Sequence, residues 1–121
     1  MADDRRLKRY ADMIKRALGE IIEFKLKDPN KGFITITGSK ISADLKIASV
    51  YYTVLGDNEQ RETTKMILNK SRAFLRSELK PFIKSRWLPE IRFFYDESQD
   101  EADKINKLLK QIENDYTSKE E

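Results

Sequence analysis

Apolar side chains recur at helical spacing near the start of the chain. Asp3 or Asp4 can cap this first helix, and Asp28 and Pro29 follow it. Because proline biases the residue before it away from helical geometry, the pattern predicts a helix that ends at about Leu26. Its predicted inward face consists of Leu7, Tyr10, Ala11, Ile14, Leu18, Ile21 and Ile22.

Two β-type segments follow. Residues 33–37 and 46–54 are rich in β-branched and aromatic side chains. In the second segment the apolar residues of one face are Ala48, Val50, Tyr52 and Val54. Residues 42–45 are turn-forming, so we expect an antiparallel hairpin. Asp57 or Asn58 is placed to cap the next helix.

The helical run at 62–83 has an inward stripe with a small polar residue, Ser71, in its middle, which predicts an interruption or a bend. Pro81 lies where this helix ends. The predicted inward residues are Ile67, Leu68, Phe74, Leu75, Leu79, Phe82 and Ile83.

A third strand at 91–95 leads to a capping box, Ser98 with Glu101, and a final amphipathic helix. The apolar face of that helix is formed by Ala102, Ile105, Leu108, Leu109 and Ile112.

The element order predicts an α+β fold with a three-stranded sheet and both main helices on one face. We expect the other face to be open and lined by Thr35, Thr37, Ser49 and Thr53. Residues 1–97 would form one domain, the helix at 98–116 would pack on that same domain, and residues 117–121 would be a disordered tail.

Charge is distributed unevenly. Residues 1–92 hold twenty Lys and Arg against twelve Asp and Glu, a balance of +8, whereas residues 93–121 have a balance of −5. A basic body with an acidic tail fits a nucleic-acid binder, and it equally fits a solvated surface with a charged terminal helix.

The chain has no Cys and no His, which excludes disulfides and Cys or His metal ligands. No apolar run approaches the ~20 residues of a membrane span, and the N-terminus lacks a signal-peptide segment, so we expect a cytoplasmic protein.

The candidate binding residues are basic. One group follows the interrupted helix: Lys65, Lys70, Arg72, Arg76, Lys80, Lys84 and Arg86. A second group opens the chain: Arg5, Arg6, Lys8 and Arg9. Such side chains bind phosphates largely without regard to sequence, although an ordinary solvated helix face looks the same. Tyr51, Trp87 and Tyr95 have the chemistry to stack bases or to fill the core.

Other sites find little support. The glycines form no phosphate-binding loop. Asp96, Ser98 and Asp100 have the early spacing of a calcium loop, but Glu101 stands where glycine is needed and Lys107 where the bidentate Glu is needed. We interpret this acidic stretch as the favourable start of a helix. The apolar face of the last helix packs on its own domain or binds a partner.

Five segments together resemble the ribosome-binding factor A family, whose members have a KH-like (type II) fold. They are residues 27–37 (KDPNKGFITIT), 41–45 (ISADL), 48–57 (ASVYYTVLGD), 74–79 (FLRSEL) and 88–96 (LPEIRFFYD). The resemblance implies a non-catalytic, cofactor-free factor that binds free small ribosomal subunits, assists late maturation of their rRNA and supports growth in the cold. The family's Ala-x-Gly helix interruption falls on Ser71, Arg72 and Ala73. Ala73 replaces a flexible glycine with a residue that favours a helix by roughly 1 kcal/mol, so a sharp kink is less expected here.

Two further functions stay open. A general single-stranded RNA or DNA binder would bind bare oligonucleotides nearly as well as ribosomal particles. A protein-interaction module would bind without sensitivity to salt. The sequence also leads us to expect a monomer.

Overall fold

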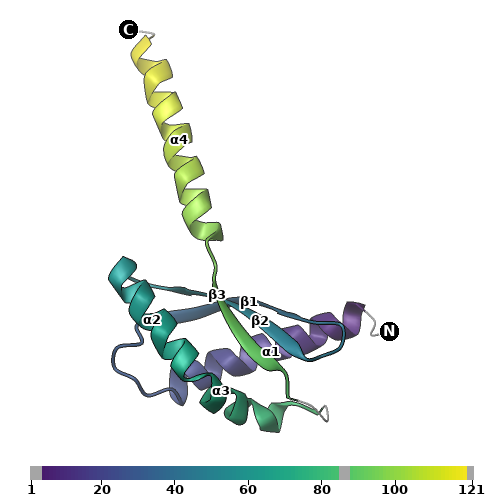
Figure 1. Cartoon of the computed structure of the whole chain (residues 1–121). Coiled ribbons are helices and arrows are strands. Elements are labelled where there is room, and N and C mark those ends of the chain that lie inside the picture. Colours follow the sequence, from purple (N-terminus) through teal and green to yellow (C-terminus); the bar gives the residue numbers. More distant parts are fainter. Residues whose placement is uncertain (1–3, 85–87, 120–121) are drawn as a thin grey trace.

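The computed structural model describes residues 4–84 and 88–119 (Figure 1). Helix α1 spans Asp4–Phe24 and is followed by strands β1 (Ile34–Ile41) and β2 (Ile47–Val54). Helices α2 (Asn58–Lys70) and α3 (Arg72–Leu79) come next, with a single 3-10 turn, η1, at Lys80–Phe82. Strand β3 (Glu90–Tyr95) and helix α4 (Ser98–Lys119) complete the order, which is that of the predicted α+β, KH-like fold.

The three strands form one mixed sheet in the order β1-β2-β3. Strands β1 and β2 are antiparallel, as the turn-forming residues 42–45 predicted, and β3 runs parallel to β2. A parallel neighbour requires a long crossover connection, which α2 and α3 supply. The β1–β2 register shifts between Ile36 and Gly38, so that Thr37 is an extra residue in a bulge.

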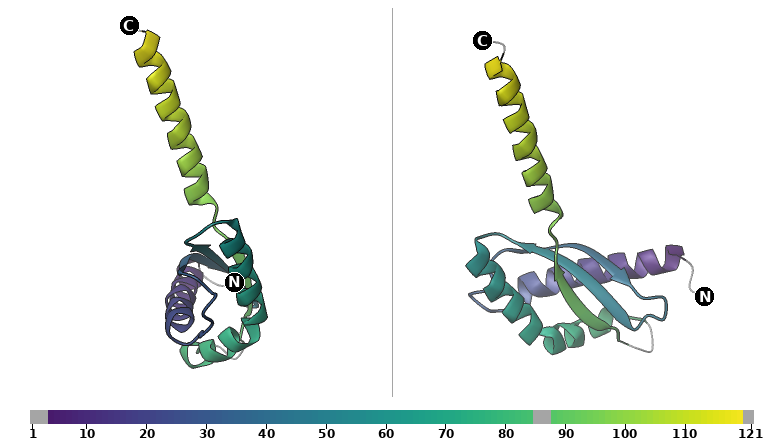
Figure 2. Two further views of the ribbon diagram at one scale, coloured as in Figure 1. Left: turned by 90° about the vertical axis from the view of Figure 1, so that its left-hand side faces the viewer. Right: turned by 45° about the horizontal axis from the view of Figure 1, so that its top comes forward.

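Helices α1, α2 and α3 lie on one face of the sheet, as predicted (Figure 2). Along β2 every second side chain is buried against them, which is the period-2 pattern of a strand with one covered face. The fully buried centre of the core consists of Ile14, Leu18, Leu68, Leu75, Leu79, Val50 and Ile91.

Two aromatic residues predicted to point inward do not. Phe74 is 41% exposed and Phe82 is 46% exposed. Leu68, Leu75 and Leu79, at spacings of seven and four, already fill the stripe of α2 and α3 that meets the sheet. Phe74 precedes Leu75 by one residue, about 100° around the helix, so it is turned away from the sheet.

The end of α1 is capped by a side chain. Lys31 donates its Nζ to the carbonyl oxygens of Ile22 and Leu26, both at 2.6 Å. These carbonyls belong to the last turn of the helix and the residues after it, where acceptors have no helical donor. The helix ends at Phe24, close to the predicted end at about Leu26. At the start of α2, Asp57 accepts a hydrogen bond from the Gln60 N–H, as a predicted cap should.

Helix α4 does not pack on the domain, which contradicts the expectation for residues 98–116. It projects from the body in both views of Figure 2, and its apolar side chains at 105, 108, 109 and 112 are 55–59% exposed. The covered face of the sheet is already filled by the other three helices, which leaves α4 no apolar surface there. The helix continues through Lys119, so it includes part of the predicted tail, and residues 120 and 121 lie outside the described part.

The capping box predicted at the start of α4 is also replaced. Ser98 is the first helical residue, and both its N–H and its hydroxyl donate to the Asp96 carboxylate. Asp96 accepts a third hydrogen bond, 2.6 Å long, from the Thr37 hydroxyl. The side chain that accepts from the first helical N–H, that of Ser98, therefore comes from two residues earlier, and it connects the helix start to β1.

Candidate nucleic-acid interface

The long helical segment divides at Ser71, between α2 and α3. Ser71 has φ −94° and ψ 4°, outside helical values, and its side chain makes no capping hydrogen bond. Its N–H still donates to the Ile67 carbonyl at 3.0 Å, and its carbonyl accepts from the Leu75 N–H at 2.9 Å. Hydrogen bonds on both sides thus span the interruption. Ala73 is exposed in the first turn of α3.

An exposed basic stripe borders this interruption. Lys65 lies on α2, and Arg72 and Arg76 lie on α3, at spacings of seven and four residues that place them along one side of the helical segment. We call these three residues the helix stripe. Lys70 lies elsewhere on the circumference of α2, and Lys80 and Lys84 continue past the end of α3. All six side chains are exposed, and Arg86 lies outside the described residues.

Arg76 is already engaged by the protein. Its Nε donates to the Pro89 carbonyl at 3.1 Å, and its Nη2 donates to the Leu88 carbonyl at 2.8 Å. The guanidinium thus holds the segment that leads into β3. By contrast, Arg72 has a 3.4 Å hydrogen bond to the Asn69 carbonyl on its own helical segment. Lys65 and Arg72 are therefore the members of the stripe best placed to meet a phosphate.

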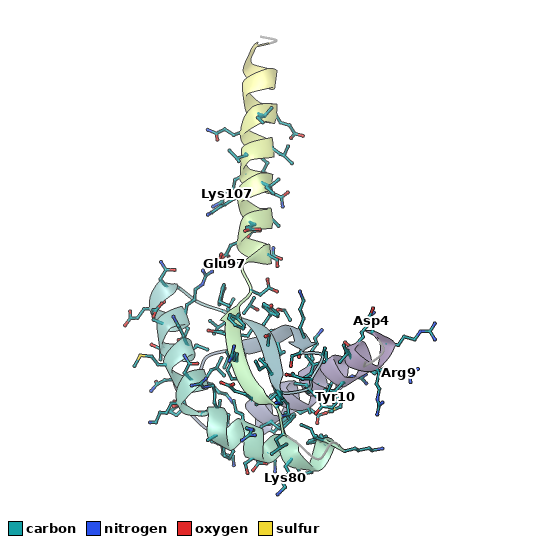
Figure 3. The ribbon with its side chains drawn as sticks, turned by 45° about the vertical axis from the view of Figure 1, so that its right-hand side comes forward. Asp4, Arg9, Tyr10, Lys80, Glu97 and Lys107 are labelled. Carbon is teal, nitrogen blue, oxygen red and sulfur yellow. The ribbon has the colours of Figure 1, made fainter. Side chains whose placement is uncertain are left out.

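The N-terminal basic group lies on the first turns of α1. Arg5, Arg6, Lys8 and Arg9 are all exposed. Figure 3 shows Arg9 toward the free end of α1 and Lys80 toward the end of α3. Phe82, two residues after Lys80, lines a shallow hollow with Met13 and Ala17 of α1. Because Met13 is one helical turn after Arg9, the chain just after α3 lies nearest the last residue of the α1 group.

A groove of about 480 Å³ separates α2 from the edge strand β3. Its charges balance, since Arg61 and Lys65 of α2 are matched by Glu62 on the same helix and by Glu97 just before α4. Of the two cations in this groove, Lys65 was predicted as a binding residue and Arg61 was not. The groove is lined by Tyr52, Asn58, Arg61, Glu62, Lys65, Phe93, Phe94, Tyr95 and Glu97.

Arg61 is held on two sides. Its Nη1 lies 2.9 Å from Oδ2 of Asp100 on α4, and its guanidinium carbon lies 4.5 Å from the centre of the Tyr95 ring. Tyr95 also packs edge-on against Tyr52 in the core. Tyr95 is thus a packing residue in this structure, whereas Tyr51 lies on the opposite, open face of the sheet. Trp87 lies outside the described residues.

A larger hollow, of about 720 Å³, lies at the base of α4. Thr35, Thr37 and Thr53 line it, as predicted for the open face, together with the acidic residues Asp96 and Asp100. Hydrogen bonds from the Ser98 side chain, from Thr37 and from the Ser98 N–H lower the pKa of Asp96. Among the side chains described, those of residues 4–84 and 88–113, no group of three acidic residues comes together in a way that could hold a metal ion.

The sequence of this chain matches a family model described as ribosome-binding factor A over residues 6–109. The chain belongs to the ribosome-binding factor A family. The match runs from the first turn of α1 through β3 to about the middle of α4.

Solved structures agree with this assignment. The crystal structure of ribosome-binding factor A from Thermus thermophilus is 27% identical, with a TM-score of 0.62, and the alignment covers 73% of this chain and 94% of that one. A solution structure of a Thermotoga maritima protein, described as a candidate ribosome-binding factor A, is 32% identical, with a TM-score of 0.69 and coverages of 81% and 93%.

A third similar structure is a homology model of the T. thermophilus factor, fitted into a cryo-EM map of a complex between the 30S subunit and that factor. It is 26% identical, with a TM-score of 0.60 and coverages of 72% and 91%. None of the described helices of the present chain combines the length and the apolar character that a membrane crossing needs.

Proposed function

We propose that this member of the ribosome-binding factor A family binds the free small ribosomal subunit and assists late maturation of its rRNA, without catalysis. The observation that carries the proposal is the exposed helix stripe beside the interruption at Ser71. The relative from T. thermophilus that was fitted into the map of a 30S complex supports the choice of particle.

The binding chemistry would be mainly electrostatic. Lys65 and Arg72 reach outward from α2 and α3, where they can contact phosphates of a folded rRNA segment. Small residues at Ser71 and Ala73 allow the rRNA backbone to approach the helices closely. Lys70, Lys80, Lys84 and the basic group at 5–9 extend the contact. Arg76 would contribute mainly by holding the loop before β3.

Maturation without catalysis requires a difference in affinity. A factor that binds one rRNA conformation more tightly than another shifts the population toward the first. Once the subunit reaches a conformation that the factor binds poorly, the factor dissociates. We further propose that the protein acts in the cytoplasm as a monomer and that its action matters most in the cold, when misfolded rRNA rearranges slowly.

Co-sedimentation tests the proposal. The protein is mixed with purified small subunits, large subunits and whole ribosomes at low and moderate salt. We expect selective binding to free small subunits that weakens as salt rises, because phosphate contacts release counterions. Equal binding to all particles and to bare RNA would replace the proposal with a general RNA binder. Binding whose affinity does not change with salt concentration would indicate a protein partner instead.

A further inference from the structure

The sheet face turned away from the three covering helices carries two ordered rows of side chains. In the register of the sheet, Lys40 pairs with Ser49 and Ser49 with Arg92. In the next row, Gly38 pairs with Tyr51 and Tyr51 with Phe94. Cross-strand partners point to the same face, so one row has a cation at each end and the next carries two aromatic rings. We call this surface the open face.

The aromatic row is partly accessible. The ring centres of Tyr51 and Phe94 are 5.7 Å apart with an angle of 31° between the rings, and Phe94 is 45% exposed. Gly38, the neighbour of Tyr51 on β1, leaves the space beside that ring open. A Cβ atom there would lie 4.0 Å from Cδ2 of Tyr51. Two adjacent rings with one unobstructed side form a surface on which a planar base can stack.

The open face also carries two acids, since Glu90 belongs to the row beside the cations and Asp96 lines the hollow beyond the aromatic row. Arg92 lies 3.4 Å from Glu90, and both side chains are about half exposed, so this ion pair is weak. Lys40 is exposed and has no ionic partner among the described side chains, those of residues 4–84 and 88–113. Residues two apart on a strand are about 6.5 Å apart, so one nucleotide can place its base on the aromatic row and its phosphate beside the cations.

The open face is continuous with the groove between α2 and β3. Phe94 lines that groove and also pairs with Tyr51 on the open face. Strand β3 is the edge of the sheet, so no further strand covers the path between the two surfaces. A single strand that passes Lys65 on α2 can therefore cross β3 at Phe94 and continue over Tyr51.

We propose that the open face is a second RNA-binding surface, which stacks unpaired bases on Tyr51 and Phe94 and pairs their phosphates with Lys40 and Arg92. This inference rests on the proposed function, because it takes rRNA as the ligand, and it adds that the segment bound here is single-stranded. A protein partner is less favoured, since the apolar part of this face is two rings wide and has polar groups on both sides, the Lys40 and Arg92 row on one and the threonine hydroxyls with Asp96 on the other.

The test uses fluorescein-labelled octaadenosine RNA as the probe, because adenine stacks strongly, and free small subunits as the second ligand. The variants are Y51L and F94L, which keep apolar bulk but remove the ring. F24L is the matched control, since Phe24 is also an exposed phenylalanine, at 65%, but ends α1, which covers the opposite face of the sheet. We expect each of the first two variants to bind the RNA about tenfold more weakly and F24L to bind as the wild type does.

A second readout does not depend on variants. When octaadenosine is added to the wild-type protein, NMR amide signals of Ser49, Tyr51 and Arg92 should shift. Unchanged signals there, or unchanged affinities of Y51L and F94L, would overturn the inference. If those variants lose small-subunit binding but not octaadenosine binding, the face contacts a protein, which also overturns it. The proposed function fails separately, when the wild-type protein itself does not bind small subunits.

Discussion

Arg61 of α2 and Asp100 of α4 form an ion pair, with Nη1 2.9 Å from Oδ2, and this pair joins the domain to its projecting helix. The same Arg61 lies over the Tyr95 ring, at the point where β3 leaves the sheet. With Asp96, which links the start of α4 to Thr37 of β1, this pair sets the direction in which α4 projects.

The D100N variant should make the orientation of α4 relative to the domain less well defined. Both side chains of the pair are about one-third exposed, so the loss in global stability should be small. Because the chain has no cysteine, D12C and K110C can carry two spin labels without other changes. We expect the distance distribution between the labels to broaden in D100N, while circular dichroism shows the same helix content. D103N is the control, since Asp103 accepts a hydrogen bond from Gln99 on its own helix. Identical distributions in the wild type and D100N would contradict a guiding role for the pair.

Arg76 should matter more for stability than for binding. Replacing it with alanine removes the donors that satisfy the Leu88 and Pro89 carbonyls. We expect urea unfolding to give a free energy of unfolding about 1–2 kcal/mol lower for R76A. The R72A variant should remain close to the wild type, because Arg72 has one long hydrogen bond within its own helical segment. Equal losses in both variants would show that the Arg76 contacts do not stabilise the loop.

The interior of α3 offers a direct test of the corrected burial pattern. Leu75 is fully buried, so L75A should lower the free energy of unfolding by about 2–5 kcal/mol. Phe74 is 41% exposed, so F74A should cost less than about 1 kcal/mol despite the larger side chain removed. Chemical denaturation compares the two. A greater loss of stability for F74A than for L75A would contradict the exposed position of Phe74 and favour the inward position that the sequence pattern predicted.

The sequence predicts the elements of this fold well because most of them are specified locally. The stripe of α1, the alternation in β2 and the Asp57 cap each depend on residues within a few positions. The failures involve contacts across the chain. Lys31 caps the end of α1 from the following loop, and Asp96 rather than Ser98 accepts the hydrogen bond at the start of α4 while also contacting β1.

The candidate site was also predicted only in part, because contacts between distant residues do not follow from local spacing. Exposure of Lys65 and Arg72 follows from helical spacing, and the sequence predicted both residues as binding residues. That Arg76 is bound to carbonyls twelve and thirteen residues away does not follow from spacing. The exposure of α4 does not follow from the sequence either. An amphipathic pattern predicts that an apolar face packs against something, but it does not identify the surface that it packs against.

Acid should weaken the junction at Asp96. Hydrogen bonds from Ser98 and then from Thr37 lower the pKa of Asp96, so the fold favours the ionised form. Its stabilising effect is complete above the unfolded-chain pKa, near 3.8, and is lost as the pH falls through the lower pKa of the folded state. We therefore expect D96N to be less stable than the wild type at pH 7, with the difference shrinking toward pH 3 in urea unfolding. Without His or Cys, the stability of either protein should change little between pH 6 and pH 8. A difference that grows at low pH would contradict the account.

The central claim is that the helix stripe binds small-subunit rRNA through phosphate contacts, and the salt dependence of small-subunit binding tests it most directly. The K65E/R72E variant is compared with K107E/K110E, which makes the same charge change on exposed positions of α4. We predict that K65E/R72E binds free small subunits more weakly and that its slope of log affinity against log salt is shallower by roughly 0.7–0.9 for each phosphate that the variant no longer neutralises. K107E/K110E should keep the wild-type slope. Equal slopes in all three proteins, or equally weakened binding in both variants, would contradict the claim.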